Sequence, residues 1–159
     1  MNSRGPLGYA PALPPEEPVA VDQISVFLEN ETGGLADAVD VLARRAIDIR
    51  AMALADQTDF GILRLIVNDA DEAARALKEA GFAVRKTPVV AVLIPDRPGG
   101  LARTLQALRG IDVEYMYAFV RRSGEDAIVV FRFEDVEKAV EALRRAGARI
   151  LEGDEVQQL

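Results

Sequence analysis

The segment VVAVLIPDRPGGLA, residues 89–102, decides the fold because it joins a continuous apolar run to a glycine pair and then to a helix-like sequence. A related segment occurs earlier in the chain, where an apolar stretch at 23–28 precedes Gly33-Gly34-Leu35-Ala36. The two glycine pairs lie 66 residues apart. A short apolar run that ends at turn residues is typical of a buried strand. Both segments therefore predict a strand that leads through a glycine turn into a helix.

The sequence after each glycine pair continues in the same order, which indicates an internal repeat. Apolar residues recur at helical spacing behind both pairs. They are Leu35, Val39 and Leu42 in the first copy and Leu101, Leu105 and Leu108 in the second. Two predicted strands follow in each copy, at 49–56 and 62–67 in the first and at 113–121 and 128–133 in the second.

A second helix is predicted in each copy after an aspartate, whose carboxylate can accept the free amide protons of a first helical turn. The aspartate is Asp69 or Asp71 in the first copy and Asp135 in the second. Gly81 and Gly147 are predicted to end these helices. Short final strands are expected at 83–87 and 149–151.

Each copy thus predicts the element order β-α-β-β-α-β over about 65 residues, which is the ferredoxin-like pattern. The fold class is α+β, with two ferredoxin-like βαββαβ repeats and antiparallel sheets. We expect a disordered Pro-rich tail at 1–19, a first domain at 20–88 and a second domain at 89–159. The open face and edge strand of each sheet need covering. We therefore expect the repeats to contact each other and the chain to form a homodimer.

The composition excludes several kinds of chemistry. The 159 residues include no Cys and no His. Disulfides, thiolate nucleophiles, histidine-based triads, and zinc or copper sites built on imidazole or thiolate are therefore ruled out. Carboxylate-only sites for magnesium or calcium stay open. We predict no catalytic residues, no metal site and no cofactor.

The net charge and the hydropathy of the chain argue against nucleic acids and membranes as its partners. The formal net charge is −7, which disfavours a nucleic-acid or anionic-membrane surface. No stretch approaches the roughly 20 apolar residues needed to cross a bilayer. The first 18 residues hold five prolines and no apolar core of a signal peptide. We expect a cytoplasmic protein with neither nucleic acid nor membrane as a partner.

The loop Pro95-Asp96-Arg97-Pro98-Gly99-Gly100-Leu101 resembles the signature D-x-P-G-x-L at the first strand–helix junction of ACT domains. The loop at 30–35 is a looser match, with Asn30 in place of the aspartate and Thr32 in place of the proline. The resemblance covers about 23–155 and includes the order of elements, as in stand-alone tandem ACT proteins. It implies an amino acid as the small-molecule ligand, bound between ACT units, and a regulated partner enzyme or pathway.

The chemistry of the glycine turns agrees with that implication. Glycine lets a ligand approach the backbone, and a helix N-terminus offers amide protons and partial positive charge to an α-carboxylate. A nearby Asp or Asn can accept hydrogen bonds from an α-ammonium group. The candidate ligand-binding residues are Asn30, Thr32, Gly33, Gly34, Leu35 and Asp48 in the first copy and Asp96, Pro98, Gly99, Gly100, Leu101 and Asp112 in the second. In the ACT pattern, Asp48 and Asp112 would face these loops from a neighbouring unit.

The copies differ along the predicted strands that begin at 49 and 113. Tyr115, Tyr117 and Phe119 alternate in the second copy, so they share one face of the strand. Alanines occupy the corresponding places in the first copy, namely Ala51, Ala53 and Ala55. One interpretation is that aromatic rings of one unit fill space left by alanines of the other. The second is that the two ligand pockets differ in volume, and both interpretations can hold together.

Three other functions were compared with amino-acid sensing. An enzyme would have to rely on two carboxylates, and no such pair stands out at the predicted strand ends. An RNA-recognition domain needs basic and aromatic residues on its third strand in a pattern such as K/R-G-F/Y-G/A-F-V-x-F/Y. Neither 60–65 nor 128–133 offers such a stacking platform. A purely structural adaptor stays open. The sequence favours a non-enzymatic, amino-acid-binding regulatory protein.

Overall fold

The computed structural model describes residues 19–29, 32–56, 59–119 and 124–159. The predicted tail, apart from Val19, and Asn30 lie outside the described residues. In the first repeat, β1 (Val21–Glu29) leads to α1 (Gly34–Arg44), followed by β2 (Ile49–Asp56), β3 (Phe60–Val67) and α2 (Ala70–Glu79). The second repeat contains α3 (Gly100–Ala107), β5 (Val113–Ala118), β6 (Asp126–Phe133), α4 (Val136–Arg145), β7 (Arg149–Leu151) and α5 (Gly153–Gln157). The α+β class and the paired ferredoxin-like repeats are confirmed.

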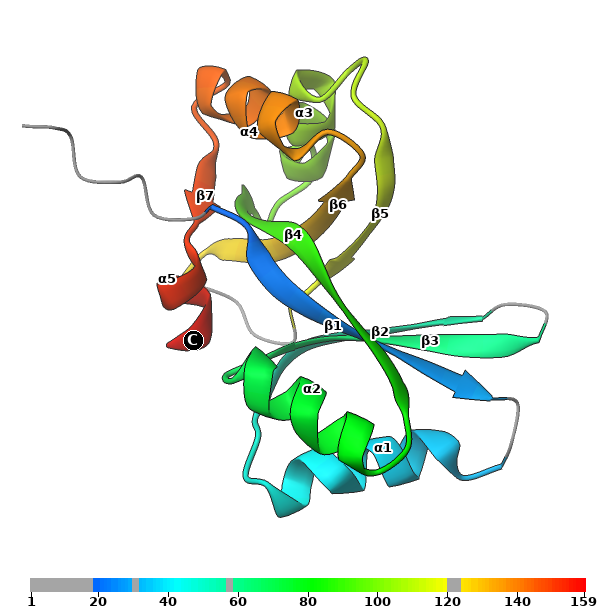
Figure 1. The fold of residues 1–159 in the computed structure, drawn as a ribbon. Helices are drawn as coiled ribbons and strands as arrows, with labels where there is room; N and C mark the ends of the chain where they lie inside the picture. Colours follow the sequence, from blue (N-terminus) through cyan, green and yellow to red (C-terminus); the bar gives the residue numbers. More distant parts are fainter. Residues whose placement is uncertain (1–18, 30–31, 57–58, 120–123) are drawn as a thin grey trace, which may run out of the picture.

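One strand, β4 (Ala83–Pro95), belongs to both repeats (Figure 1). The sequence predicted two strands here, at 83–87 and 89–94, and that prediction is wrong. The first half of β4 pairs with β1 as far as Val89, and pairing with β6 begins at Val90. The strand therefore changes partner without a turn. The strand order is β2-β3-β1-β4-β6-β5, with β7 also paired to β4.

The second helix of each repeat begins and ends where the sequence predicts. The carboxylate of Asp69 accepts the amide proton of Glu72 at 2.9 Å, and that of Asp135 accepts from Lys138 at 3.0 Å. Asp69 is therefore the N-cap of α2, and Asp71 lies inside the helix. Gly81 and Gly147 follow directly after the C-caps of α2 and α4, both with positive φ.

Three apolar clusters form the core. One lies between the sheet of the first repeat and α1 with α2, and another lies between the sheet of the second repeat and α3 with α4. Val19, which the sequence analysis placed in the tail, packs against the second of these. The third cluster joins the two repeats on the sheet faces that α1 to α4 leave uncovered. This arrangement buries most of the two open faces against each other.

The aromatic strand β5 packs on the alanine strand β2, as the first interpretation of their difference proposed. Ala51 is fully buried, and Tyr117 and Phe119 pack against the cluster that contains it. Ala51 and Phe119 also form an antiparallel bridge between the two repeats. Larger side chains at position 51 would therefore collide with the aromatic residues of the other repeat.

A buried polar group also links the repeats. Gln23 of β1 has no exposed surface, and its amide donates to the Tyr115 hydroxyl at 2.9 Å and to Ser25 Oγ at 3.0 Å. The Tyr117 hydroxyl donates to Gln23 Oε1 at 2.7 Å. The guanidinium of Arg64 lies 3.8 Å above the Tyr115 ring. Burial raises the pKa of Tyr117, so its hydroxyl stays protonated and available as a donor.

The sequence analysis did not predict the short helix α5. A capping box holds its start, in which the Glu155 carboxylate accepts the amide proton of Glu152 at 2.9 Å and the Glu152 side chain is bonded in return. Val156 is fully buried in the cluster between the repeats. Glutamate is not a preferred N-cap residue, so the sequence gives only a weak indication that a helix begins here.

Candidate functional site

The first helix of each repeat begins at a glycine whose backbone conformation other residues rarely adopt. Gly33 and Gly99 are the N-caps of α1 and α3, with φ of 99° and 88° in the left-handed region. Neither N-cap has a side chain that bonds to the first helical turn. The first helical turns are thus not capped by the side chain of the N-cap residue, and each helix end carries the partial positive charge that favours a carboxylate.

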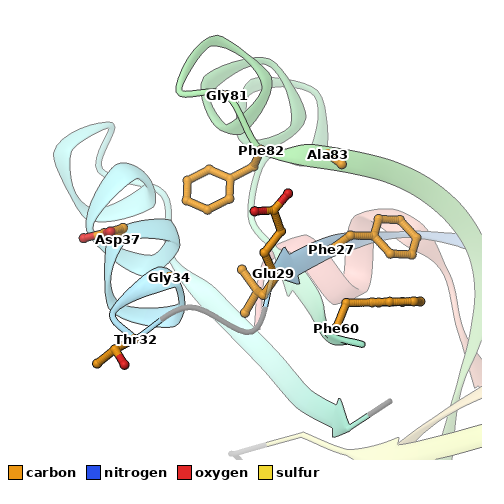
Figure 2. A pocket seen from close by; sticks show the side chains of 10 residues that line it. Phe27, Glu29, Thr32, Gly34, Asp37, Phe60, Gly81, Phe82 and Ala83 are labelled. Carbon is orange, nitrogen blue, oxygen red and sulfur yellow. The ribbon is translucent and has the colours of Figure 1, made fainter. Parts of the chain in front are cut away.

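The first turn opens onto a pocket of about 530 Å³, which we call the first-turn pocket. Figure 2 shows its lining side chains gathered from the end of β1, the start of α1, the start of β3 and the junction of α2 with β4. The lining residues are Phe27, Leu28, Glu29, Thr32, Gly34, Asp37, Phe60, Gly81, Phe82 and Ala83. All of them belong to the first repeat.

The second turn is packed more tightly. A Cβ added to Gly100 would overlap the Pro95 carbonyl oxygen, whereas none of the described residues lies within 4 Å of one added to Gly34. The cavity beside this turn is smaller, about 390 Å³, and Arg103 lines it. The first turn is thus the more accessible, although the second matches the ACT signature better.

The predicted site residues of the first copy divide into two groups. Thr32 and Gly34 line the first-turn pocket, Gly33 forms the turn, and Leu35 is exposed beside it. Asp48 lies at the other end of α1, where its carboxylate accepts from Arg50 at 2.7 Å. It does not line the first-turn pocket, so the chain by itself does not bring Asp48 to the turn.

The predicted residues of the second copy surround the tighter turn. Gly99 and Gly100 form it, and Pro98 and Leu101 are exposed on either side. Asp96 lines a separate cavity of about 430 Å³ together with Pro95, Arg97, Glu125 and Asp126. Asp112 is exposed and lines neither turn cavity.

The sequence analysis expected a cleft shared between neighbouring repeats. Each cavity beside a glycine turn is instead lined by a single repeat, as far as the described residues show. The inter-repeat contact is formed by the sheet faces and leaves both turns on the outside of the chain. A shared cleft at a turn would therefore need a second chain.

Sequence reasoning missed the aromatic and acidic lining of the first-turn pocket. The missed residues are Phe27, Glu29, Asp37, Phe60 and Phe82. A signal for them exists, because the second copy has different residue types at all five equivalent positions.

The described part of the chain offers neither a cluster of metal ligands nor a membrane-spanning helix. Among those residues, no group of three or more acidic side chains is placed to hold a metal ion. No helix there has both the length and the apolar character that crossing a membrane demands.

The geometry defines a class of protein: a pair of ferredoxin-like domains joined through one strand, each with a glycine turn at its first helix. The family model of the ACT domain pair matches residues 19–159. The chain belongs to this family.

Solved structures agree with the assignment. The protein BT0572 from Bacteroides thetaiotaomicron is 39% identical, with a TM-score of 0.82 over 89% of this chain and 98% of that one. The ligand-free regulatory subunit of aspartate kinase from Thermus thermophilus is 20% identical, with a TM-score of 0.57 over 81% of this chain and 93% of that one. Its counterpart from Thermus flavus is 21% identical, with a TM-score of 0.55 over 82% and 94%. No curated protein matches the sequence.

Proposed function

We propose that this ACT pair is a regulatory protein that binds an amino acid at the first glycine turn and modulates a partner enzyme or pathway. The observation that carries the proposal is the first-turn pocket, which has the N-terminus of α1 on one wall and two carboxylates, Glu29 and Asp37, on others. An α-carboxylate fits the helix end, and an α-ammonium group fits a carboxylate. The pocket thus offers complementary charge to both ends of a zwitterion.

Family membership supports a regulatory role. Two of the similar structures are described as regulatory subunits of aspartate kinase. Their identity to this chain is low, so they support the fold and provide an analogy for the function. We propose by this analogy that the chain has no catalysis of its own and acts on a separate enzyme.

We also propose that the chain forms a homodimer through the outer side of the first repeat. Met52 and Leu54 of β2 are 52% and 57% exposed. They pair with Leu65 and Leu63, so they lie on the helix-covered face of the sheet but extend beyond the helices. An exposed apolar strand at the end of a sheet is a typical site of association.

The first helix extends this apolar surface. Gly34 and Asp37 of α1 face α2 across the first-turn pocket. Leu35 and Val39 lie on the opposite side of the same helix, away from α2, and are 42% and 36% exposed. A second chain bound there would reach the first glycine turn. A homodimer would thereby create the interface between ACT units at which we propose the ligand is held.

A thermal-shift screen with the common amino acids tests ligand binding. A ligand at about 100 times its Kd stabilises the folded protein by roughly 2.7 kcal/mol, so at least one amino acid should raise the Tm. Gly34→Leu should abolish that rise by filling the pocket. Gly153→Leu is the matched control, because Gly153 also begins a helix and has open space around it. If no amino acid raises the Tm, a structural adaptor is the better account.

Sedimentation analysis tests the homodimer. We expect the protein to sediment as a dimer and Leu54→Glu to sediment as a folded monomer, because the new charge would be buried in the contact. Lys138→Glu, on the exposed surface of α4, introduces the same residue away from the apolar side and should stay dimeric. A monomeric protein, or a dimeric Leu54→Glu variant, would exclude this interface.

A further inference from the structure

The first-turn pocket carries a set of side chains that the fold does not require. Phe27, Glu29, Asp37, Phe60 and Phe82 line it. The equivalent residues of the second repeat, 66 positions later, are Leu93, Pro95, Arg103, Asp126 and Ala148. The strand registers support this alignment, because Glu29 is opposite Phe60 and Pro95 is opposite Asp126. Since both repeats adopt the same fold, the aromatic and acidic set of the first has another role.

The aromatic rings surround a carboxylate. Figure 2 shows the side chain of Glu29 between the Phe82 ring and the pair formed by Phe27 and Phe60. The Phe27 and Phe60 ring centroids are 6.0 Å apart with an interplanar angle of 55°. A carboxylate beside ring faces attracts an ammonium group, and the rings add to that attraction.

The two acids of the pocket keep their binding capacity for a ligand. Within the described residues, neither the Glu29 nor the Asp37 carboxylate has an ion pair or a side-chain hydrogen bond. Other acids of the first repeat are paired, for example Glu72 with Arg45 and Arg75. Glu29 and Asp37 are exposed, and among the described residues they lack such a partner.

We propose that the first-turn pocket selects an amino acid with a large apolar side chain and excludes acidic amino acids, an inference that rests on the proposed function. The α-ammonium group lies against Glu29, and the α-carboxylate points to the amide protons at Gly34. The apolar side chain contacts the phenylalanine rings, which offer large apolar surfaces. A ligand with a carboxylate side chain is repelled by Glu29 and Asp37. The second repeat, with Arg103 and without aromatic residues in its cavity, does not bind this ligand.

Isothermal titration calorimetry with L-phenylalanine, L-leucine and L-aspartate tests the selectivity. We expect binding of phenylalanine or leucine and no binding of aspartate at the same concentration. Glu29→Gln should weaken that binding at least about 10-fold, because a charge-assisted hydrogen bond is lost. Asp126→Asn, the matched change in the second repeat, should bind like the unmodified chain. Sedimentation of each variant separates an effect on the pocket from an effect on assembly.

The outcomes distinguish this inference from the proposed function. Binding of aspartate as tight as that of phenylalanine, or unchanged binding by Glu29→Gln, would overturn the selectivity while amino-acid sensing stands. An effect of Asp126→Asn equal to that of Glu29→Gln would place the ligand in the second repeat and overturn the inference too. If none of the common amino acids binds, the proposed function itself falls.

Discussion

The two glycines that begin α1 and α3 have the same sequence context but different surroundings. Gly34 and Gly100 both follow a left-handed glycine and precede Leu-Ala. As far as the described residues show, a Cβ would meet a backbone oxygen at Gly100, that of Pro95, and not at Gly34. A glycine–leucine pair predicts a turn but not which atoms will lie against it. The sequence therefore predicts where both turns lie, but it does not predict which of the two is more accessible to a ligand.

Alanine substitutions should separate the two positions. Gly100→Ala should destabilise the protein by about 1–3 kcal/mol, because its Cβ would overlap the Pro95 carbonyl oxygen and the turn would have to shift. Gly34→Ala should be neutral or stabilising by about 0.4–1 kcal/mol, because its Cβ would meet none of the described residues and the unfolded chain loses freedom. Urea unfolding measures both changes. Equal effects of the two substitutions would show that the turns are packed alike.

At the scale of elements, helices were easier to predict than strand connections. Asp69 and Asp135 gave the starts of α2 and α4 because capping is a local interaction between neighbouring residues. Continuity of β4 depends instead on which strands lie beside it, β1 before Val90 and β6 after it. Partner changes of this kind are long-range and leave no local signal.

The capping box of α5 should make the C-terminal helix sensitive to acid. The backbone bond from Glu152, and then the bond from Arg149, hold the pKa of Glu155 below its ordinary value of 4.5. A lowered pKa in the folded state contributes stability above about pH 4.5, and this contribution is lost as pH falls further. In the same way, Lys86 lowers the pKa of Asp71, and Arg75 lowers the pKa of Glu72.

Glu155→Gln tests the contribution of the cap, because the amide oxygen can still accept from Glu152 while carrying no charge. Urea midpoints measured from pH 7 to pH 3 should fall less for this variant than for the unmodified chain. The difference between the two should therefore shrink below about pH 4.5. Parallel curves throughout the range would mean that Glu155 does not stabilise the fold through its charge.

At the scale of the whole molecule, the repeats are joined by more than a shared strand. The apolar cluster between the sheets and the bonds of Gln23 both cross from one repeat to the other. The alternation of aromatic residues along β5 predicted that Tyr115 and Tyr117 share one face of the strand. Their hydrogen bonds to Gln23 were not, because the partners are more than 90 residues apart in the chain.

Tyr117→Phe should reveal the strength of this connection. Removing the hydroxyl leaves Gln23 Oε1 buried without its donor, which should cost about 1–3 kcal/mol in the free energy of unfolding. Gln23→Leu removes the other side of the same bond, so the double variant should be less destabilised than the sum of the single ones. Urea unfolding of the four proteins gives the coupling energy, for which we expect about 0.5–3 kcal/mol. Additive effects would show that the bond between Tyr117 and Gln23 does not help to hold the repeats together.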